Sequence, residues 1–224
     1  MWTHTRESQE KITPIQALQY LKEGNHRFVN NLKVNRNLLN QVNQTSDGQF
    51  PVATILSCID SRTSAELIFD QGLGDIFSIR IAGNILNEDI LGSMEYACGV
   101  AGSKIIVVLG HTKCGAVTSA CDNFEMGHIT GLLHKLKPAI LNEKSTKTDR
   151  NGSNIKFVNK VSSINVHLTL NEIRNKSSIL RKLEDEEKIL MVGALYDVEN
   201  GEVTFYDDHL RAKYLKEFEK KEKE

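Results

Sequence analysis

Two short segments of the sequence carry side chains that can bind a metal ion. Cys58 and Asp60 lie in Cys-Ile-Asp-Ser-Arg, and His111 and Cys114 lie in His-Thr-Lys-Cys. Two thiolates and one imidazole form a ligand set that suits zinc, and three protein ligands leave the fourth tetrahedral position open for water. Buried cysteines are also common as inert packing groups, so spacing alone leaves packing as an equal alternative.

The elements around these segments indicate how they meet. Four short apolar runs rich in β-branched residues are typical of buried strands, and helix-compatible segments lie between them. The runs are residues 51–58, 76–81, 104–109 and 188–195, and the helical segments are 64–69, 88–100 and 115–124. The Asn-Gly turn within residues 198–206 predicts a terminal hairpin.

This alternation predicts an α/β fold. We expect a mostly parallel central sheet of about four strands, an antiparallel edge strand and flanking helices. Ligands of open parallel sheets bind outside the carboxyl ends of the strands. If the first and third strands are neighbours, Cys58 therefore meets His111 and Cys114.

The remaining segments suggest one domain over residues 1–224. Residues 1–45 are predicted to form an N-terminal helical arm, in which Thr13 caps a helix that begins at Pro14. Residues 142–160 are polar with little periodicity and are predicted to form a loop. Residues 216–224 alternate in charge and are predicted to be a solvated tail.

Composition excludes several classes of partner. The 224 residues include 28 Lys and Arg against 29 Asp and Glu, and this near-neutral balance provides no field for nucleic acid or an anionic membrane. No apolar run is long enough for a membrane span. The first residues lack the pattern of a secretory signal, so we expect a cytoplasmic protein; a periplasmic location is the alternative if a signal was removed.

At these motifs the sequence resembles the β-class carbonic anhydrases. The resemblance rests on the paired Cys-x-Asp-x-Arg and His-x-x-Cys motifs and extends over about residues 11–206. It includes Arg-Ile-Ala-Gly-Asn at residues 80–84, Leu-Gly-Ser-Met-Glu-Tyr at 91–96, and the segment 110–117 around the second motif.

The resemblance implies a site and an activity. Cys58, His111 and Cys114 would bind Zn²⁺, and Asp60 with Arg62 would form the catalytic pair. The expected reaction is the reversible hydration of carbon dioxide to bicarbonate and a proton, by attack of zinc-bound hydroxide on the carbon. Two thiolates place more negative charge on the ion than three imidazoles do, so we expect the active form to be favoured at alkaline pH.

Further residues follow from the same resemblance. Gln49, Phe77 and Gly115 would contact the substrate, with Gln49 contributed across a dimer interface, so a homodimer or homotetramer is expected. In a closed form of some family members, the equivalent of Asp60 is the fourth metal ligand. Ile55 stands where some members with a bicarbonate-closed state carry Trp, so we expect Asp60 to remain paired with Arg62.

Other functions remain in competition. A hydrolase of carbonyl sulfide or carbon disulfide could use similar ligands, and a non-catalytic zinc-binding protein would need a fourth ligand. A phosphatase cysteine is disfavoured, because Arg62 follows Cys58 too closely for a Cys-x5-Arg loop. Gly72 and Gly74 lack the strand-turn-helix context of a dinucleotide site.

Overall fold

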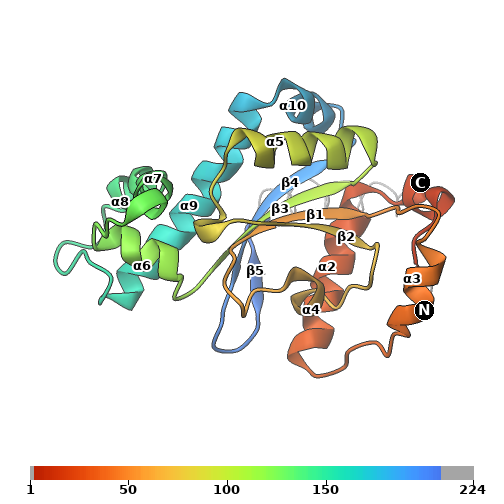
Figure 1. Ribbon diagram of the computed structural model, residues 1–224, viewed down its shortest axis with the longest axis horizontal. Helices are drawn as coiled ribbons and strands as arrows, with labels where there is room; N and C mark the ends of the chain where they lie inside the picture. The colour runs from red at the N-terminus through yellow and green to blue at the C-terminus, as the bar shows by residue number, and fades with distance from the viewer. Residues whose placement is uncertain (1–2, 208–224) are drawn as a thin grey trace, which may run out of the picture.

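The computed structural model describes residues 3–207 and is built around one five-stranded sheet. The strand order is β2-β1-β3-β4-β5, in which the first four strands are parallel and β5 is antiparallel to β4. The strands are β1 (Ala53–Ser57), β2 (Ile76–Arg80), β3 (Ile105–His111), β4 (Leu190–Tyr196) and β5 (Val203–Phe205). The predicted α/β class, with its antiparallel edge strand, is confirmed (Figure 1).

Burial explains which strands lie inside the sheet. All residues of β1 and β3 are buried, as expected for central strands covered by helices on both faces. In the edge strand β2 only the first residue, Ile76, is buried, and the remaining residues alternate between partly exposed and exposed. The β4–β5 hairpin turns at Gly201, whose φ of 83° lies in the left-handed region that glycine tolerates.

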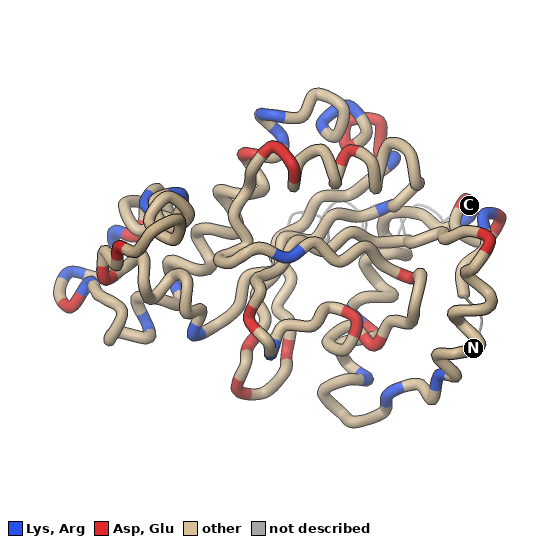
Figure 2. Tube along the Cα trace, viewed as in Figure 1, with Lys and Arg blue, Asp and Glu red and all other residues tan. Residues whose placement is uncertain are grey.

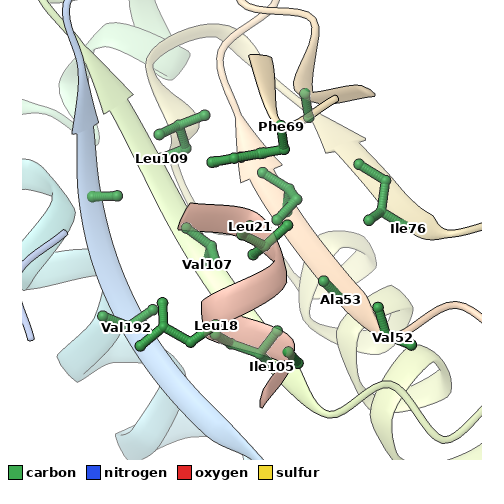
Figure 3. Close-up of a cluster of buried hydrophobic side chains, with 14 of the residues drawn as sticks. Leu18, Leu21, Val52, Ala53, Phe69, Ile76, Ile105, Val107, Leu109 and Val192 are labelled. Carbon is green, nitrogen blue, oxygen red and sulfur yellow. The ribbon is translucent and has the colours of Figure 1, made fainter. Parts of the chain in front are cut away.

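One face of the sheet is covered by N-terminal helices. The helices that precede the sheet are α1 (Arg6–Lys11), α2 (Pro14–Val29) and α3 (Leu38–Gln44), and α4 (Ala65–Ile68) follows β1. Leu18 and Leu21 of α2 point into the apolar cluster formed by β1, β3 and β4, together with Phe69 (Figure 3). The segment predicted as a helical arm therefore packs on the sheet of its own chain.

The opposite face carries α5 (Glu88–Glu95), α9 (Ile155–Lys176) and α10 (Ser178–Asp185). Figure 1 shows α5 and α10 on the side of the sheet opposite α2 and α4. At one end of the molecule, α6 (Gly115–Cys121), α7 (Gly127–His134) and α8 (Lys137–Asn142) pack with α9 in a separate apolar cluster, which includes Cys58 and Cys114.

Most predicted helices are found, with local differences. Thr13 caps α2 as expected: its side chain accepts a hydrogen bond from the Gln16 amide, and Pro14 opens the helix. The segment predicted over residues 88–100 is α5 followed by the π-helix η2 (Tyr96–Val100). A 3₁₀ turn, η1 (Ala82–Asn84), separates β2 from α5.

The loop predicted over residues 142–160 is wrong in its last part, residues 155–160. Asn154 caps α9 by accepting a hydrogen bond from the Phe157 amide, so the helix begins at Ile155. Phe157 and Val158 are buried, and they belong to an apolar face that continues far beyond the predicted loop.

Two sequence expectations concern the ends and the surface. The predicted charged tail over residues 216–224 lies outside the described residues. Within residues 3–207, no helix combines the length and apolar character needed to cross a bilayer. Figure 2 shows Lys and Arg interspersed with Asp and Glu along the described chain, consistent with the near-neutral balance.

Candidate metal centre

Three potential metal ligands meet at the carboxyl ends of β1 and β3. Cys58 follows β1, His111 is the last residue of β3, and Cys114 precedes α6. Because β1 and β3 are parallel neighbours, with Ser57 opposite Leu109, their ends bring the two sequence motifs together. The three ligand atoms lie within 4.8 Å of one another, and all three residues are buried. The meeting predicted from strand order is confirmed.

His111 is oriented with one ring nitrogen available. Its Nδ1 lies 2.9 Å from the backbone carbonyl of Thr112, so Nδ1 carries the proton and donates it to that oxygen. Nε2 is then an acceptor, and it is buried without a hydrogen-bond partner among the described residues. An unpaired buried lone pair is costly, and a bound cation would satisfy it.

The two thiols behave as a coupled pair. The Cys58 and Cys114 sulfurs lie 3.9 Å apart in a buried environment. The hydrogen bond from Cys114 is the main cause that lowers the pKa of Cys58, against the opposing effect of burial. The same contact, followed by burial, raises the pKa of Cys114. One proton is therefore lost readily and the second is retained, unless a cation replaces it.

Backbone and side-chain contacts fix the Cys58 loop. The Gly83 amide donates a hydrogen bond to the Cys58 sulfur at 3.3 Å. Arg80 donates from Nε to the Cys58 carbonyl at 3.0 Å and from Nη2 to the Asp60 carbonyl at 2.6 Å. The Thr63 hydroxyl donates to the same two carbonyls. The first ligand is thus held by several contacts.

The His111 loop is attached to the terminal hairpin. The Thr112 hydroxyl donates to Asp197 at 3.0 Å and accepts from the Val198 amide at 3.1 Å. Sequence reasoning did not single out Arg80, Thr112 or Asp197 as individual residues. Arg80 did lie in a segment that carried the family resemblance, whereas Asp197 contacts Thr112 only through the pairing of β3 with β4.

Asp60 and Arg62 form a two-pronged ion pair beside the ligands. Arg62 Nε and Nη2 donate to the two carboxylate oxygens at 2.9 and 2.8 Å. These bonds are the main cause that holds the pKa of Asp60 far below its usual range, so the carboxylate stays ionised at neutral pH. The carboxylate does not belong to the group of three potential ligands found among the described residues.

The three predicted substrate-binding residues lie in different parts of the fold. Gly115 is exposed directly after Cys114, and a Cβ atom placed on it would meet nothing within 4 Å. Phe77 lies on the edge strand β2 and lines a hollow of about 580 Å³ with α5 residues and Tyr96. Gln49 is exposed before the amino end of β1, whereas Cys58 follows its carboxyl end.

Comparison with known proteins identifies the family. Residues 53–203 match the family model described as "Carbonic anhydrase", a span that includes both ligand motifs. Carbonic anhydrase 2 of Mycobacterium tuberculosis is 34% identical over 200 residues, which cover 87% of this chain and 93% of that protein. The chain belongs to the β-carbonic anhydrase family. The carbonic anhydrase of Mycolicibacterium smegmatis is also 34% identical, over a matched segment that covers 85% of this chain and 92% of that protein.

Solved structures agree with this assignment. The β-carbonic anhydrase CafA of Aspergillus fumigatus is 26% identical, with a TM-score of 0.67 over 75% of this chain and 81% of that one. The β-carbonic anhydrase CcaA is 25% identical, with a TM-score of 0.66 over 88% and 87% of the two chains. This β-carbonic anhydrase is accordingly an enzyme with a metal-binding-capable Cys-His-Cys site.

Proposed function

We propose that this β-carbonic anhydrase binds one zinc ion per chain and catalyses the reversible hydration of carbon dioxide to bicarbonate and a proton. The observation that carries the proposal is the buried group of Cys58, His111 and Cys114 beside the Asp60–Arg62 pair. The family match and the names of the relatives support the same reaction.

The donor set fits zinc. Two sulfurs and one imidazole nitrogen are typical zinc ligands, and a site with three protein ligands is of the catalytic kind. The unpartnered Nε2 of His111 and the close approach of the two buried sulfurs are both accounted for by a divalent cation. When bound, zinc supplies a Lewis acid that lowers the pKa of a water molecule towards neutrality.

The protein groups position the reactants. The ionised Asp60 carboxylate accepts a hydrogen bond from the attacking oxygen and orients its lone pair towards carbon dioxide. Arg62 holds that carboxylate in place through two charge-assisted hydrogen bonds. Because Asp60 stays ionised at neutral pH, it acts as a fixed acceptor and the product proton leaves to buffer.

The substrate pocket is proposed to form between two copies of the chain. Gly115 leaves space directly beside Cys114, while Gln49 lies at the opposite end of β1 from Cys58. Five strand residues span about 16 Å, a distance that the Gln49 side chain does not cover within one chain. A homodimer or homotetramer, in which Gln49 reaches the site of a partner, accounts for this separation.

Metal analysis and a stopped-flow assay test the proposed function together. The purified protein should contain about one zinc per chain and should accelerate acidification of a carbon dioxide solution, with lower activity after zinc is removed by a chelator. A protein that binds zinc but releases hydrogen sulfide from carbonyl sulfide, without hydrating carbon dioxide, would be the rival hydrolase. Absence of metal and of both activities would contradict the proposal.

A further inference from the structure

The long helix α9 contacts the loop that carries His111 and Cys114, and also the turn η1, which contacts Cys58. Asn159 makes a side-chain hydrogen bond to the backbone of the loop, and Asn165 makes one to the backbone of η1. We propose that these two asparagines are positioning residues that set the separation of the Cys58 and Cys114 sulfurs. The inference rests on the proposed zinc site and adds to it a source of its geometry.

Asn165 acts on Cys58 through one residue, Gly83. Its Nδ2 donates to the Gly83 carbonyl at 2.9 Å, and the Gly83 amide donates to the Cys58 sulfur at 3.3 Å. Asn165 is only 4% exposed, so no water replaces the amide if it is lost. Gly83 has a φ of 69°, in the left-handed region. The hydrogen bond from Asn165 therefore helps to hold an unusual turn that aims an N–H group at the sulfur.

Asn159 acts on the His111–Cys114 loop. Its Oδ1 accepts a hydrogen bond from the Lys113 amide at 2.8 Å. Lys113 has a φ of 54°, a left-handed conformation that is uncommon outside glycine, and it immediately precedes Cys114. The Asn159 contact thus stabilises the turn that directs Cys114 back towards His111.

The helix that carries both asparagines is closely packed against the sheet. A Cβ atom added to Gly110 would lie 2.7 Å from Cγ2 of Val166, and one added to Gly193 would lie 2.6 Å from Cγ1 of the same residue. These two glycines of β3 and β4 allow this close approach, and Gly110 directly precedes His111. Asn159 and Asn165 are about 9 Å apart along a single helix, so one rigid element holds both the His111–Cys114 loop and the η1 turn.

The two asparagines use opposite ends of their amide groups. At Asn159 the partner is an N–H group, so the side chain must accept a hydrogen bond. At Asn165 the partner is a carbonyl oxygen, so the side chain must donate. Asp retains an acceptor but Leu offers neither group, and both are similar in size to Asn. Asn159→Asp should therefore rescue what Asn159→Leu loses.

Metal affinity measured by chelator competition tests the inference. Asn159→Leu and Asn165→Leu should each weaken zinc binding about ten- to a hundredfold, the range expected when a group that supports a metal ligand is lost. Asn159→Asp should remain near the wild type. Asn171→Leu is the matched control, because Asn171 is exposed on the same helix.

A spectroscopic readout separates positioning from general stability. With Co²⁺ in place of zinc, the thiolate charge-transfer bands should shift in both Leu variants and not in Asn159→Asp or Asn171→Leu. Thermal unfolding of the metal-free proteins shows whether a variant is simply less stable. If Asn165→Leu does not fold, the comparison of Asn159→Leu with Asn159→Asp decides alone. Unchanged affinity and spectra in Asn159→Leu would overturn the inference.

Measurements on the wild-type protein distinguish a failure of this inference from a failure of the proposed function. If the wild type binds zinc and hydrates carbon dioxide while the Leu variants match it, only the role of the asparagines fails. If the wild type binds no metal at all, the proposed function and this inference fail together.

Discussion

Cys58 and Cys114 show how a buried site can prefer a cation to protons. Their sulfurs lie 3.9 Å apart, and both residues belong to the apolar cluster that includes side chains of α6, α8 and α9. A second negative charge in this environment is unfavourable unless a positive ion balances it. The strength of the site therefore depends on having both thiolates.

Replacing either thiol should remove most of the zinc. Cys58→Ser and Cys114→Ser each exchange a soft thiolate for a weakly coordinating hydroxyl, so zinc affinity should fall about tenfold or more and activity should fall with it. Elemental analysis after equilibrium dialysis measures the change. Cys98→Ser is the control, because Cys98 is buried away from the three ligands and burial raises its pKa to about 12. Full zinc and full activity in both ligand variants would show that the ligands are misassigned.

Asp60→Asn should separate metal binding from catalysis. The amide keeps the shape of the carboxylate but loses its charge, so it holds Arg62 weakly and cannot orient the attacking oxygen as a charged acceptor. We expect zinc content to be unchanged and the hydration rate to fall about a hundredfold or more. Stopped-flow rates normalised to zinc content measure this. An unchanged rate would remove Asp60 from the mechanism, and a crystal structure at about pH 8 with Asp60 bound to the metal would contradict the open site.

At the residue scale, the sequence predicted the ligands but not what supports them. Cys58, His111 and Cys114 stand in two motifs whose spacing alone left packing as an equal alternative, and the resemblance to the family assigned them to the metal. The contact from the Gly83 amide to sulfur depends on a left-handed turn, and the Asn165 contact joins residues that are far apart in the sequence. No local pattern encodes such contacts, because they arise only when α9 packs against the sheet.

At the scale of elements, the packing of α9 on β3 depends on the absence of a side chain at Gly110. A Cβ atom there would lie 2.7 Å from Val166 Cγ2 and 3.3 Å from Leu195 Cδ1. Gly110→Ala should therefore destabilise the protein by about 1–3 kcal/mol through overpacking. Urea unfolding measures the loss.

Gly131→Ala provides the matched comparison. Gly131 lies inside α7, where an added Cβ atom would meet nothing within 4 Å. Alanine favours the helical state relative to glycine, so this variant should be as stable as the wild type or slightly more stable. Equal stability of Gly110→Ala and Gly131→Ala would show that α9 is not closely seated on β3.

The loop between α8 and α9 is organised around one buried carboxylate. Glu143 accepts hydrogen bonds from the Ser145 hydroxyl, the Ser145 and Thr146 amides, and Arg150. Burial alone would raise the pKa of Glu143, but the hydrogen bonds from Ser145 and Thr146 outweigh it and hold the pKa at about 2. An ionised Glu143 is therefore part of the folded loop.

This depressed pKa predicts a specific loss of stability in acid. The folded pKa lies below the ordinary value of 4.5, so the unfolded chain takes up the proton first as the pH falls. The stabilisation is complete above about pH 4.5 and is lost progressively towards about pH 2. Glu143→Gln should be less stable than the wild type at about pH 7, and the difference should narrow below about pH 4.5. Urea unfolding of both proteins across this range measures it; a constant difference would contradict the assignment.

Elements were predictable where composition and periodicity agree. The four parallel strands are short apolar runs, and each was expected within a few residues of its observed limits. The start of α9 was not, because the polar run that precedes the helix continues up to its cap, Asn154. The change in pattern comes only with the apolar residues of the first turn, Ile155, Phe157 and Val158, so the boundary is marked by the cap and by these residues together.

At the scale of the whole molecule, the proposed role of Gln49 requires a second copy of the chain. Gln49 is expected to contact substrate, yet it lies at the opposite end of β1 from Cys58. Apolar side chains are also exposed on several elements towards that end, among them Leu38, Leu39 and Val42 of α3 and Leu73 before β2. A second copy that covers part of this surface would bring its own Gln49 to the site.

Complementation between two inactive variants tests that arrangement. Gln49→Ala and Asp60→Asn should each be nearly inactive as homodimers, because each removes one group from every site. In a mixed dimer, the Gln49→Ala chain supplies an intact Asp60, and its partner supplies an intact Gln49 to the same site. Random mixing of equal amounts should therefore restore about a quarter of the wild-type sites.

Restoring activity requires the subunits to exchange. The two proteins are therefore mixed under conditions that dissociate the oligomer and are then reassociated. Sedimentation checks the oligomeric state, and elemental analysis checks the zinc content. Each variant treated alone is the control and should remain inactive. If Gln49 acted within its own chain, every site of the mixture would still lack either Gln49 or Asp60, and activity would not return. A mixture no more active than its components, or a wild-type monomer with full activity, would therefore exclude a site shared between chains.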